Sequence, residues 1–302
     1  MLARDNYPDD SGIVPRPSVH KRRFFLAKGT DSVKALEYFV AHYAPRHEVR
    51  PVLLVVLPDV ILISVRDPLG RRPQYLRDVN SAFVRYLNRC LDTSGGMIRP
   101  GDPKPIIAVD ADSEFAALLE AALAPTQEIT PFSRTWCGTI FTPEDAGEWR
   151  TAERPEKVNP KTYPAEAIDY QIAKPEFQDG DSFHQIKTRF RTHRRAAEAR
   201  LQAQAQKTGK RFIGANAPEL FDPNFLPKEP LFEPSEDRLR GAPELVAVAR
   251  VRSKNYHVRY RECVRDLRAG RIGILWPAGT NFHHVINGFP RDPAGRLTPL
   301  ME

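Results

Sequence analysis

The chain has 302 residues, 41% of them hydrophobic, which is enough for one large domain or two smaller ones with a real core. Its formal net charge of +7 and its pI near 9.4 suggest a polyanionic partner, either nucleic acid or an anionic surface. No run approaches the roughly 20 apolar residues of a membrane helix, and the first residues lack the apolar core of a signal peptide. We therefore expect no membrane partner and a cytoplasmic location, with association to the nucleoid left open.

The three cysteines, Cys90, Cys137 and Cys263, are far apart and odd in number. No CxxC pair occurs, which argues against a cysteine zinc site and against a disulfide framework. We expect reduced thiols, no metal and no cofactor.

The N-terminal region passes from a polar stretch into apolar ones. Residues 1–18 are polar and proline-bearing and predict a flexible arm. Residues 24–26, Phe-Phe-Leu, predict a strand with a basic start. Apolar residues at helical spacing predict a helix over 33–44, which Pro45 ends.

Two apolar runs follow, 52–57 and 60–65, hinged at Pro58-Asp59. Each is short, rich in Val, Ile and Leu, and bounded by turn residues, which predicts a buried β-hairpin. The further elements that the apolar spacing predicts are a helix over 73–91, a strand over 106–109 and a helix over 114–123.

The predicted order is strand, helix, strand, strand, helix, strand, helix. This order is typical of the split βαβ arrangement of ferredoxin-like domains. We therefore expect residues 19–125 to be an α+β domain in which a ferredoxin-like four-stranded antiparallel sheet carries helices on one face.

The remainder of the chain differs in composition from this first domain. Residues 126–182 are rich in proline and aromatic side chains and predict an irregular segment that wraps the first domain. Residues 183–302 predict a basic helical C-terminal region, with helices over 182–206 and 244–269. Both helices carry a marked excess of Lys and Arg.

A series of short motifs runs through most of the chain. The motifs are Lys21-Arg22-Arg23-Phe24-Phe25-Leu26, Arg66-Asp67-Pro68-Leu69-Gly70-Arg71, Leu76-Arg77-Asp78, Leu87-Asn88-Arg89, Val109-Asp110-Ala111-Asp112, Trp136-Cys137-Gly138 and Trp276-Pro277-Ala278-Gly279-Thr280. In order and spacing they resemble the single-tyrosine HUH transposases, and specifically the branch of REP-associated tyrosine transposases.

The resemblance implies a site that cuts single-stranded DNA next to an imperfect hairpin. In that family two histidines on the second strand of the hairpin bind a divalent metal, and a tyrosine on the third helix attacks the phosphorus. Here the histidine positions are Val60 and Leu62, and the tyrosine position lies near Ala121. The resemblance therefore implies a catalytically inactive relative that keeps a nucleic-acid-binding body.

Two alternatives stay open. An active strand-cleaving and strand-joining transposase would need a displaced tyrosine and metal site, for which Asp59, Asp110 and Asp112 are the nearest carboxylates, although Asp110 and Asp112 also suit a helix cap. His283 and His284 are adjacent, and neighbours in a strand face opposite ways, which argues against a metal ion shared by these two histidines. The second alternative is a non-enzymatic subunit of a larger nucleic-acid complex.

We expect the nucleic-acid interface on the two basic helices, because like charges at i,i+4 repel unless phosphates neutralise them. The expected partner is single-stranded or hairpin DNA, with RNA and the oligomeric state left open. The predicted binding residues are Lys21, Arg22, Arg23, Arg77, Arg85, Lys187, Arg191, Arg194, Arg195, Lys210, Arg211, Arg252, Lys254 and Arg259.

Overall fold

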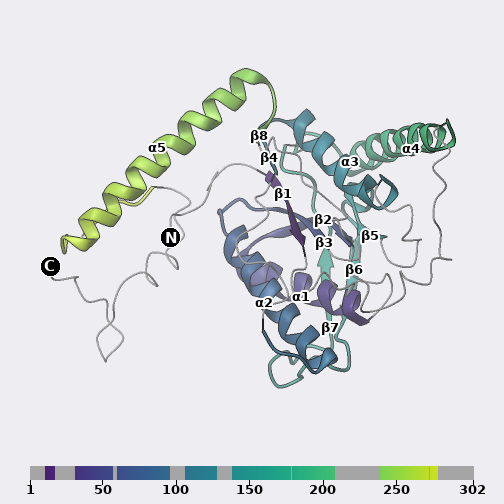
Figure 1. Ribbon diagram of the computed structural model, residues 1–302, viewed down its shortest axis with the longest axis horizontal. Coiled ribbons are helices and arrows are strands. Elements are labelled where there is room, and N and C mark those ends of the chain that lie inside the picture. The colour runs from purple at the N-terminus through teal and green to yellow at the C-terminus, as the bar shows by residue number, and fades with distance from the viewer. Residues whose placement is uncertain are drawn as a thin grey trace.

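The computed structural model describes residues 11–17, 31–56, 60–95, 106–127, 138–177, 179–207, 239–271 and 273–277. The described chain mixes helices and strands and is an α+β protein, as predicted. Six strands form one sheet in the order β5-β2-β3-β1-β4-β8, and β6 and β7 form a separate hairpin (Figure 1). The strands are β1 (Ser11–Pro17), β2 (Arg50–Val56), β3 (Val60–Arg66), β4 (Ile106–Ala108), β5 (Gly138–Phe141), β6 (Trp149–Glu153), β7 (Ala167–Gln171) and β8 (Leu239–Arg240).

Five α-helices and one 3-10 helix accompany these strands in the described residues. The predicted hairpin is confirmed as β2 and β3, and the two long basic helices are confirmed as α4 and α5. The first helix runs two residues beyond Pro45. The helices are α1 (Asp31–His47), α2 (Arg72–Leu91), α3 (Ala111–Gln127), η1 (Pro143–Asp145), α4 (Phe183–Lys207) and α5 (Pro243–Arg268).

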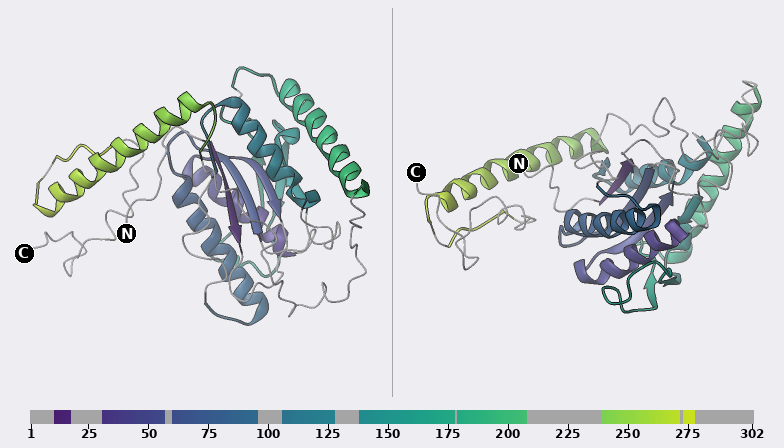
Figure 2. Two further views of the ribbon diagram at one scale, coloured as in Figure 1. Left: turned by 45° about the horizontal axis from the view of Figure 1, so that its top comes forward. Right: turned by 60° about the horizontal axis from the view of Figure 1, so that its bottom comes forward.

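The main sheet differs from the predicted four-stranded sheet in two ways. It has six strands, because β5 pairs with β2 at one edge and β8 pairs with β4 at the other. Its helices cover both faces: α1 and α2 lie on one side, and α3 packs on the other against β1, β2 and β4 (Figures 1 and 2). All positions of β2 after Arg50 are buried, and a strand that is apolar on both sides needs a cover on both sides.

The first strand lies earlier than predicted. β1 falls inside the stretch 1–18, so the prediction of an arm is wrong for Ser11–Pro17, while the strand predicted over 24–26 lies outside the described residues. Gly12 and Ile13 pair with both β3 and β4, and Ser11 pairs with β4. The two prolines of β1 come later, where the strand pairs with β3 alone, so a missing amide hydrogen is tolerated there.

The segment 126–182 also holds more regular structure than predicted. It contributes β5 to the main sheet, and its β6–β7 hairpin packs against α1. The Tyr170 hydroxyl of β7 donates to Glu37 Oε1 of α1 at 2.6 Å, and Arg150 Nε of β6 donates to the same oxygen at 3.0 Å. Regular strands therefore replace the irregular wrap, because their backbone groups pair with one another and with β2.

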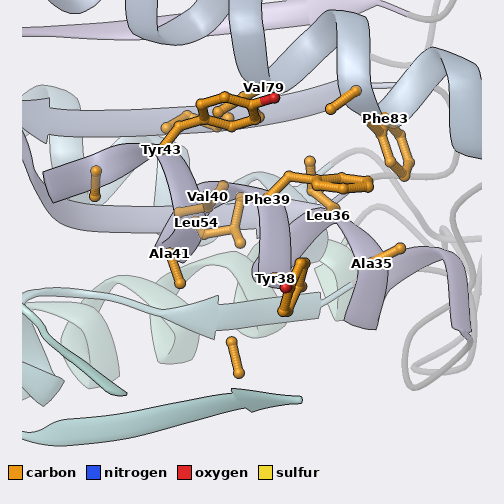
Figure 3. Packing of buried hydrophobic residues seen from close by; sticks show 14 of the residues in the cluster. Ala35, Leu36, Tyr38, Phe39, Val40, Ala41, Tyr43, Leu54, Val79 and Phe83 are labelled. Atoms are coloured by element: carbon orange, nitrogen blue, oxygen red, sulfur yellow. The ribbon is translucent and has the colours of Figure 1, made fainter. Parts of the chain in front are cut away.

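The core on one side of the sheet is built by α1, α2 and the inward-facing residues of β2 and β3. Leu36, Phe39 and Val40 of α1 meet Phe83 of α2 and Leu54 of β2, and all five are at most 1% exposed (Figure 3). Buried side chains recur along α2 at steps of one and three residues, so α2 presents one apolar face. Nine residues of α1 between Val33 and Ala44 are buried, at steps of one and two, because α2, β2 and the β6–β7 hairpin cover this helix on more than one side.

Candidate nucleic-acid interface

The positions where the resemblance places metal and tyrosine lie in packed core. Leu62 is 0% exposed, and Ala121 of α3 is 4% exposed. Ile61 and Ile63 belong to the core shared with α1 and α2, so alternation along β3 turns Leu62 to the face that α3 covers. The side chain of Val60 lies outside the described part of the chain.

These side chains do not fit the divalent metal that the resemblance implies. Leu and Ala are hydrocarbon and offer no lone pair to a cation. Among the described residues no group of three or more His, Cys, Asp or Glu side chains could hold a metal ion. Tyr75 and Tyr86 are at most 5% exposed, and the Tyr75 hydroxyl donates to the Val40 carbonyl at 3.0 Å, so neither phenol faces solvent.

A polar cluster lies at the end of β3, the strand that holds Leu62. Arg66 forms ion pairs with Asp179 and, at 3.7 Å, with Glu176. The buried Glu114 carboxylate of α3 accepts hydrogen bonds from the Glu176 and Phe177 amides at 2.7 and 2.9 Å. Burial raises the pKa of the Glu176 carboxyl. The cluster fastens the segment before α4 to the sheet.

Asp110 caps a helix, which is one of the two roles predicted for it from the sequence, the other being a displaced metal site. Its Oδ1 accepts from the Ser113 amide at 2.7 Å at the start of α3, and its Oδ2 accepts from the Ala242 amide at 2.7 Å at the start of α5. Partial burial alone would raise the pKa of Asp110, but these hydrogen bonds hold it below the ordinary value. Asp110 therefore joins two helices that are far apart in the sequence.

The basic residues of α4 are mostly neutralised within the chain. Arg191 and Arg194 both pair with Glu144 of η1, and Lys187 donates to Glu148 at 2.6 Å. Arg195 is exposed and has no ion pair among the described residues. The sequence predicted a free cationic surface on α4, but most of it faces acids that come from η1 and the turn after it.

Replacing Glu144 by Gln should test this pairing. Glu144 is 13% exposed, and its charge holds two guanidinium groups, so Glu144→Gln should lower the free energy of unfolding by about 2 kcal/mol. Glu148→Gln is the matched control, because its more exposed pair with Lys187 should be worth about 0.5 kcal/mol. Urea denaturation measures both values, and equal losses in the two variants would contradict the special role of Glu144.

The helix α5 extends away from the body and is attached at its N-terminal end (Figures 1 and 2). β8 pairs in parallel with β4, and the Ala242 amide donates to Asp110. At the other end the segment 273–277 returns along α5: the Trp276 ring lies 5.8 Å from the Tyr260 ring, and the Cys263 thiol donates to the Leu275 carbonyl at 3.4 Å. The tyrosine face of α5 is therefore covered.

A row of cationic side chains runs along another side of α5. Its residues are Arg250, Lys254, Arg261, Arg265 and Arg268, and we call it the α5 row. With His257 between Lys254 and Arg261, the steps are three or four residues and average one helical turn, so the row stays on one side. All five side chains are exposed.

The acids of α5 lie off this row. Glu262 pairs with Arg259 at 3.1 Å, and Asp266 pairs with Arg271 at 3.1 Å. Within the described residues no member of the α5 row forms an ion pair with a carboxylate, although Arg261 Nε donates to the His257 carbonyl at 3.2 Å. The α5 row is thus a line of positive charge that the chain itself does not neutralise.

The structure sorts the predicted binding residues into different settings. Lys254 is in the α5 row, whereas Arg259 is paired with Glu262 and the side chain of Arg252 lies outside the described residues. Arg77 and Arg85 lie on α2, where Arg77 pairs with Asp78 at 3.2 Å. Lys21, Arg22, Arg23, Lys210 and Arg211 lie outside the described residues.

Four members of the α5 row were not among the predicted binding residues: Arg250, Arg261, Arg265 and Arg268. Their recurrence at helical spacing was the available signal. Summing charge along the helix hid it, because Arg259 adds charge but lies on the opposite side of α5, where it pairs with Glu262.

No helix within the described residues is both long and apolar enough to cross a membrane. No protein-family model, no curated protein and no solved structure matches this chain.

Proposed function

We propose that the chain is a nucleic-acid-binding protein, a catalytically inactive relative of the single-tyrosine HUH transposases that contacts phosphates through α5. The α5 row is the observation that carries this proposal. A helix with five exposed cations on one side costs stability through like-charge repulsion. A phosphate backbone relieves that repulsion and releases counterions on binding.

The strand order supports the transposase-like part of the proposal. The four middle strands, β4-β1-β3-β2, are antiparallel, with α1 between β1 and β2 and α2 between β3 and β4. This is the order that a ferredoxin-like core would have, with β5 and β8 added at its edges. The buried Leu62 and Ala121 support the proposal that the chain is catalytically inactive, because neither side chain binds a cation or attacks phosphorus.

Fluorescence anisotropy with labelled oligonucleotides tests binding. The full chain should bind DNA at about 50 mM salt, and glutamine at all five positions of the α5 row should weaken binding at least about tenfold. A matched control removes five exposed charges from the body instead. Its substitutions are Lys34→Gln, Arg46→Gln, Arg89→Gln, Lys157→Gln and Lys161→Gln. Lack of binding by the full chain at any salt, or equal losses in both variants, would refute the proposal.

A further inference from the structure

We propose that the partner of the α5 row is the phosphate backbone of a double helix, bound without reading its base sequence. This inference rests on the proposed function and adds the class of nucleic acid and the mode of recognition. It draws on the straightness of the row, on the position of the aromatic rings of α5, and on the length of the row compared with the width of a groove.

The geometry of the row suits a stiff partner. From Arg250 to Arg268 the row spans 18 helical positions, or about 27 Å at about 1.5 Å per residue. Its charges lie in a line, with neighbours about 5 to 6 Å apart at the Cβ atoms, except that Lys254 and Arg261 are about 10 Å apart across His257. A duplex presents phosphates at fixed positions over that length, about eight base pairs at about 3.4 Å each. A flexible single strand would first have to straighten, which costs conformational entropy.

The aromatic rings of α5 face away from the row. Sequence-tolerant binding of single strands uses exposed rings on which the unpaired bases stack. Tyr256 and Tyr260 are each 7% exposed, and they stack on one another at 6.1 Å between ring centroids. Trp276 packs against Tyr260. Both tyrosines and the tryptophan are thus engaged with each other, and α5 offers unpaired bases no tyrosine or tryptophan platform.

The α5 row is too long to read bases from within one groove. The row extends over about 27 Å, whereas the major groove is about 12 Å wide and winds around the duplex, so a straight helix leaves it after a few base pairs. Residues 273–277 cover the tyrosine face and leave the row exposed. The outer members of the row therefore reach phosphates at the groove rim rather than base edges, and phosphate contacts carry no base sequence.

Salt dependence measures the contacts directly. Five phosphate contacts on a duplex give a slope of about −4.5 in log affinity against log salt, which is about a 500-fold loss between 50 and 200 mM. The same contacts on a single strand give a slope of about −3.5 and about a 130-fold loss. We expect the full chain and the five-glutamine variant to differ in slope by about 4 to 5 on duplex DNA.

Three comparisons complete the experiment. Two duplexes of unrelated sequence should bind within about threefold of each other, and both should bind at least about tenfold more tightly than a single strand of equal length. A variant in which the four row arginines become lysine should keep the duplex slope and bind within a few-fold, because phosphate accepts a point charge whereas bidentate reading of guanine needs the guanidinium fork. Polyglutamate at equal charge should compete poorly.

The outcomes separate the inference from the proposed function. Preference for a single strand, for one of the two sequences, or for arginine over lysine would overturn the inference and leave nucleic-acid binding in place. Equal competition by polyglutamate would also overturn the inference and would favour an acidic protein partner. Absence of binding to every oligonucleotide would overturn both.

Discussion

Leu62→His should lower the free energy of unfolding by about 4 kcal/mol and should not create a metal site. Leu62 is 0% exposed, so the substitution removes a packed hydrocarbon side chain and leaves an imidazole among apolar neighbours. Removing a buried Leu costs about 2 to 5 kcal/mol, and a buried polar group without a partner costs about 1 to 3 kcal/mol. Both effects act in the same direction here.

Denaturation in urea, followed by tryptophan fluorescence, measures the change. Leu62→Met keeps the volume and the apolar character and should cost less than about 1.5 kcal/mol. Leu62→Ala gives a second reading if the histidine variant fails to fold, with an expected loss of about 3 kcal/mol. A Leu62→His protein that is as stable as the parent, or that gains stability on adding Zn²⁺, would show that solvent reaches this position and that the site can be rebuilt.

The centre of the fold was predictable because its sequence signals are local. The two apolar runs of the hairpin contain a single polar side chain, Ser64, so they predict a buried hairpin, and the structure buries every residue from Pro51 to Val56. The long basic helices were equally clear, since α5 starts at Pro243 and ends just before Gly270.

The first strand and the second helix layer were not predictable in this way. β1 reads Ser-Gly-Ile-Val-Pro-Arg-Pro, whose two prolines argue against a strand inside a sheet. The prolines are tolerated because β4 is short: it pairs only with the first three residues of β1, and both prolines lie beyond it. Likewise, the cover that α3 gives to the second face depends on its contacts with β1 and β2, which join segments that are far apart in the sequence.

The charge pattern shows the clearest limit of sequence reasoning. Arg194 of α4 and Arg261 of α5 look alike in the sequence, but Glu144 pairs with Arg194 from 50 positions away, while Arg261 forms no ion pair with a carboxylate in the described part of the chain. Which cations stay available for a ligand depends on tertiary contacts between distant segments. Helical periodicity identifies a row on one helix, but it cannot identify the acids that another segment brings to it.

The direction of α5 depends on one glycine at its attachment to the body. Gly241 has φ +156°, and a Cβ at this position would lie 2.3 Å from Val109 Cγ2 and 2.6 Å from Asp110 Oδ2. Gly241→Ala should therefore push β8 off β4 and break the hydrogen bond from the Ala242 amide to Asp110. Strain of about 1 to 3 kcal/mol corresponds to about a 5- to 150-fold faster hydrogen exchange at that amide.

Gly270 supplies the control for Gly241→Ala, because it also has a positive φ, +71°, but a Cβ there would meet nothing within 4 Å. Gly270→Ala should leave exchange at the Ala242 amide unchanged, while the core amides of β2 and β3 should stay protected in both variants, since β8 lies at the sheet edge.

If the α5 row must be held in a fixed direction to meet a stiff duplex, Gly241→Ala should also weaken duplex binding more than Gly270→Ala does. Unchanged exchange at Ala242 in Gly241→Ala would mean that the attachment yields without cost, and α5 would then be a tethered arm rather than a fixed one.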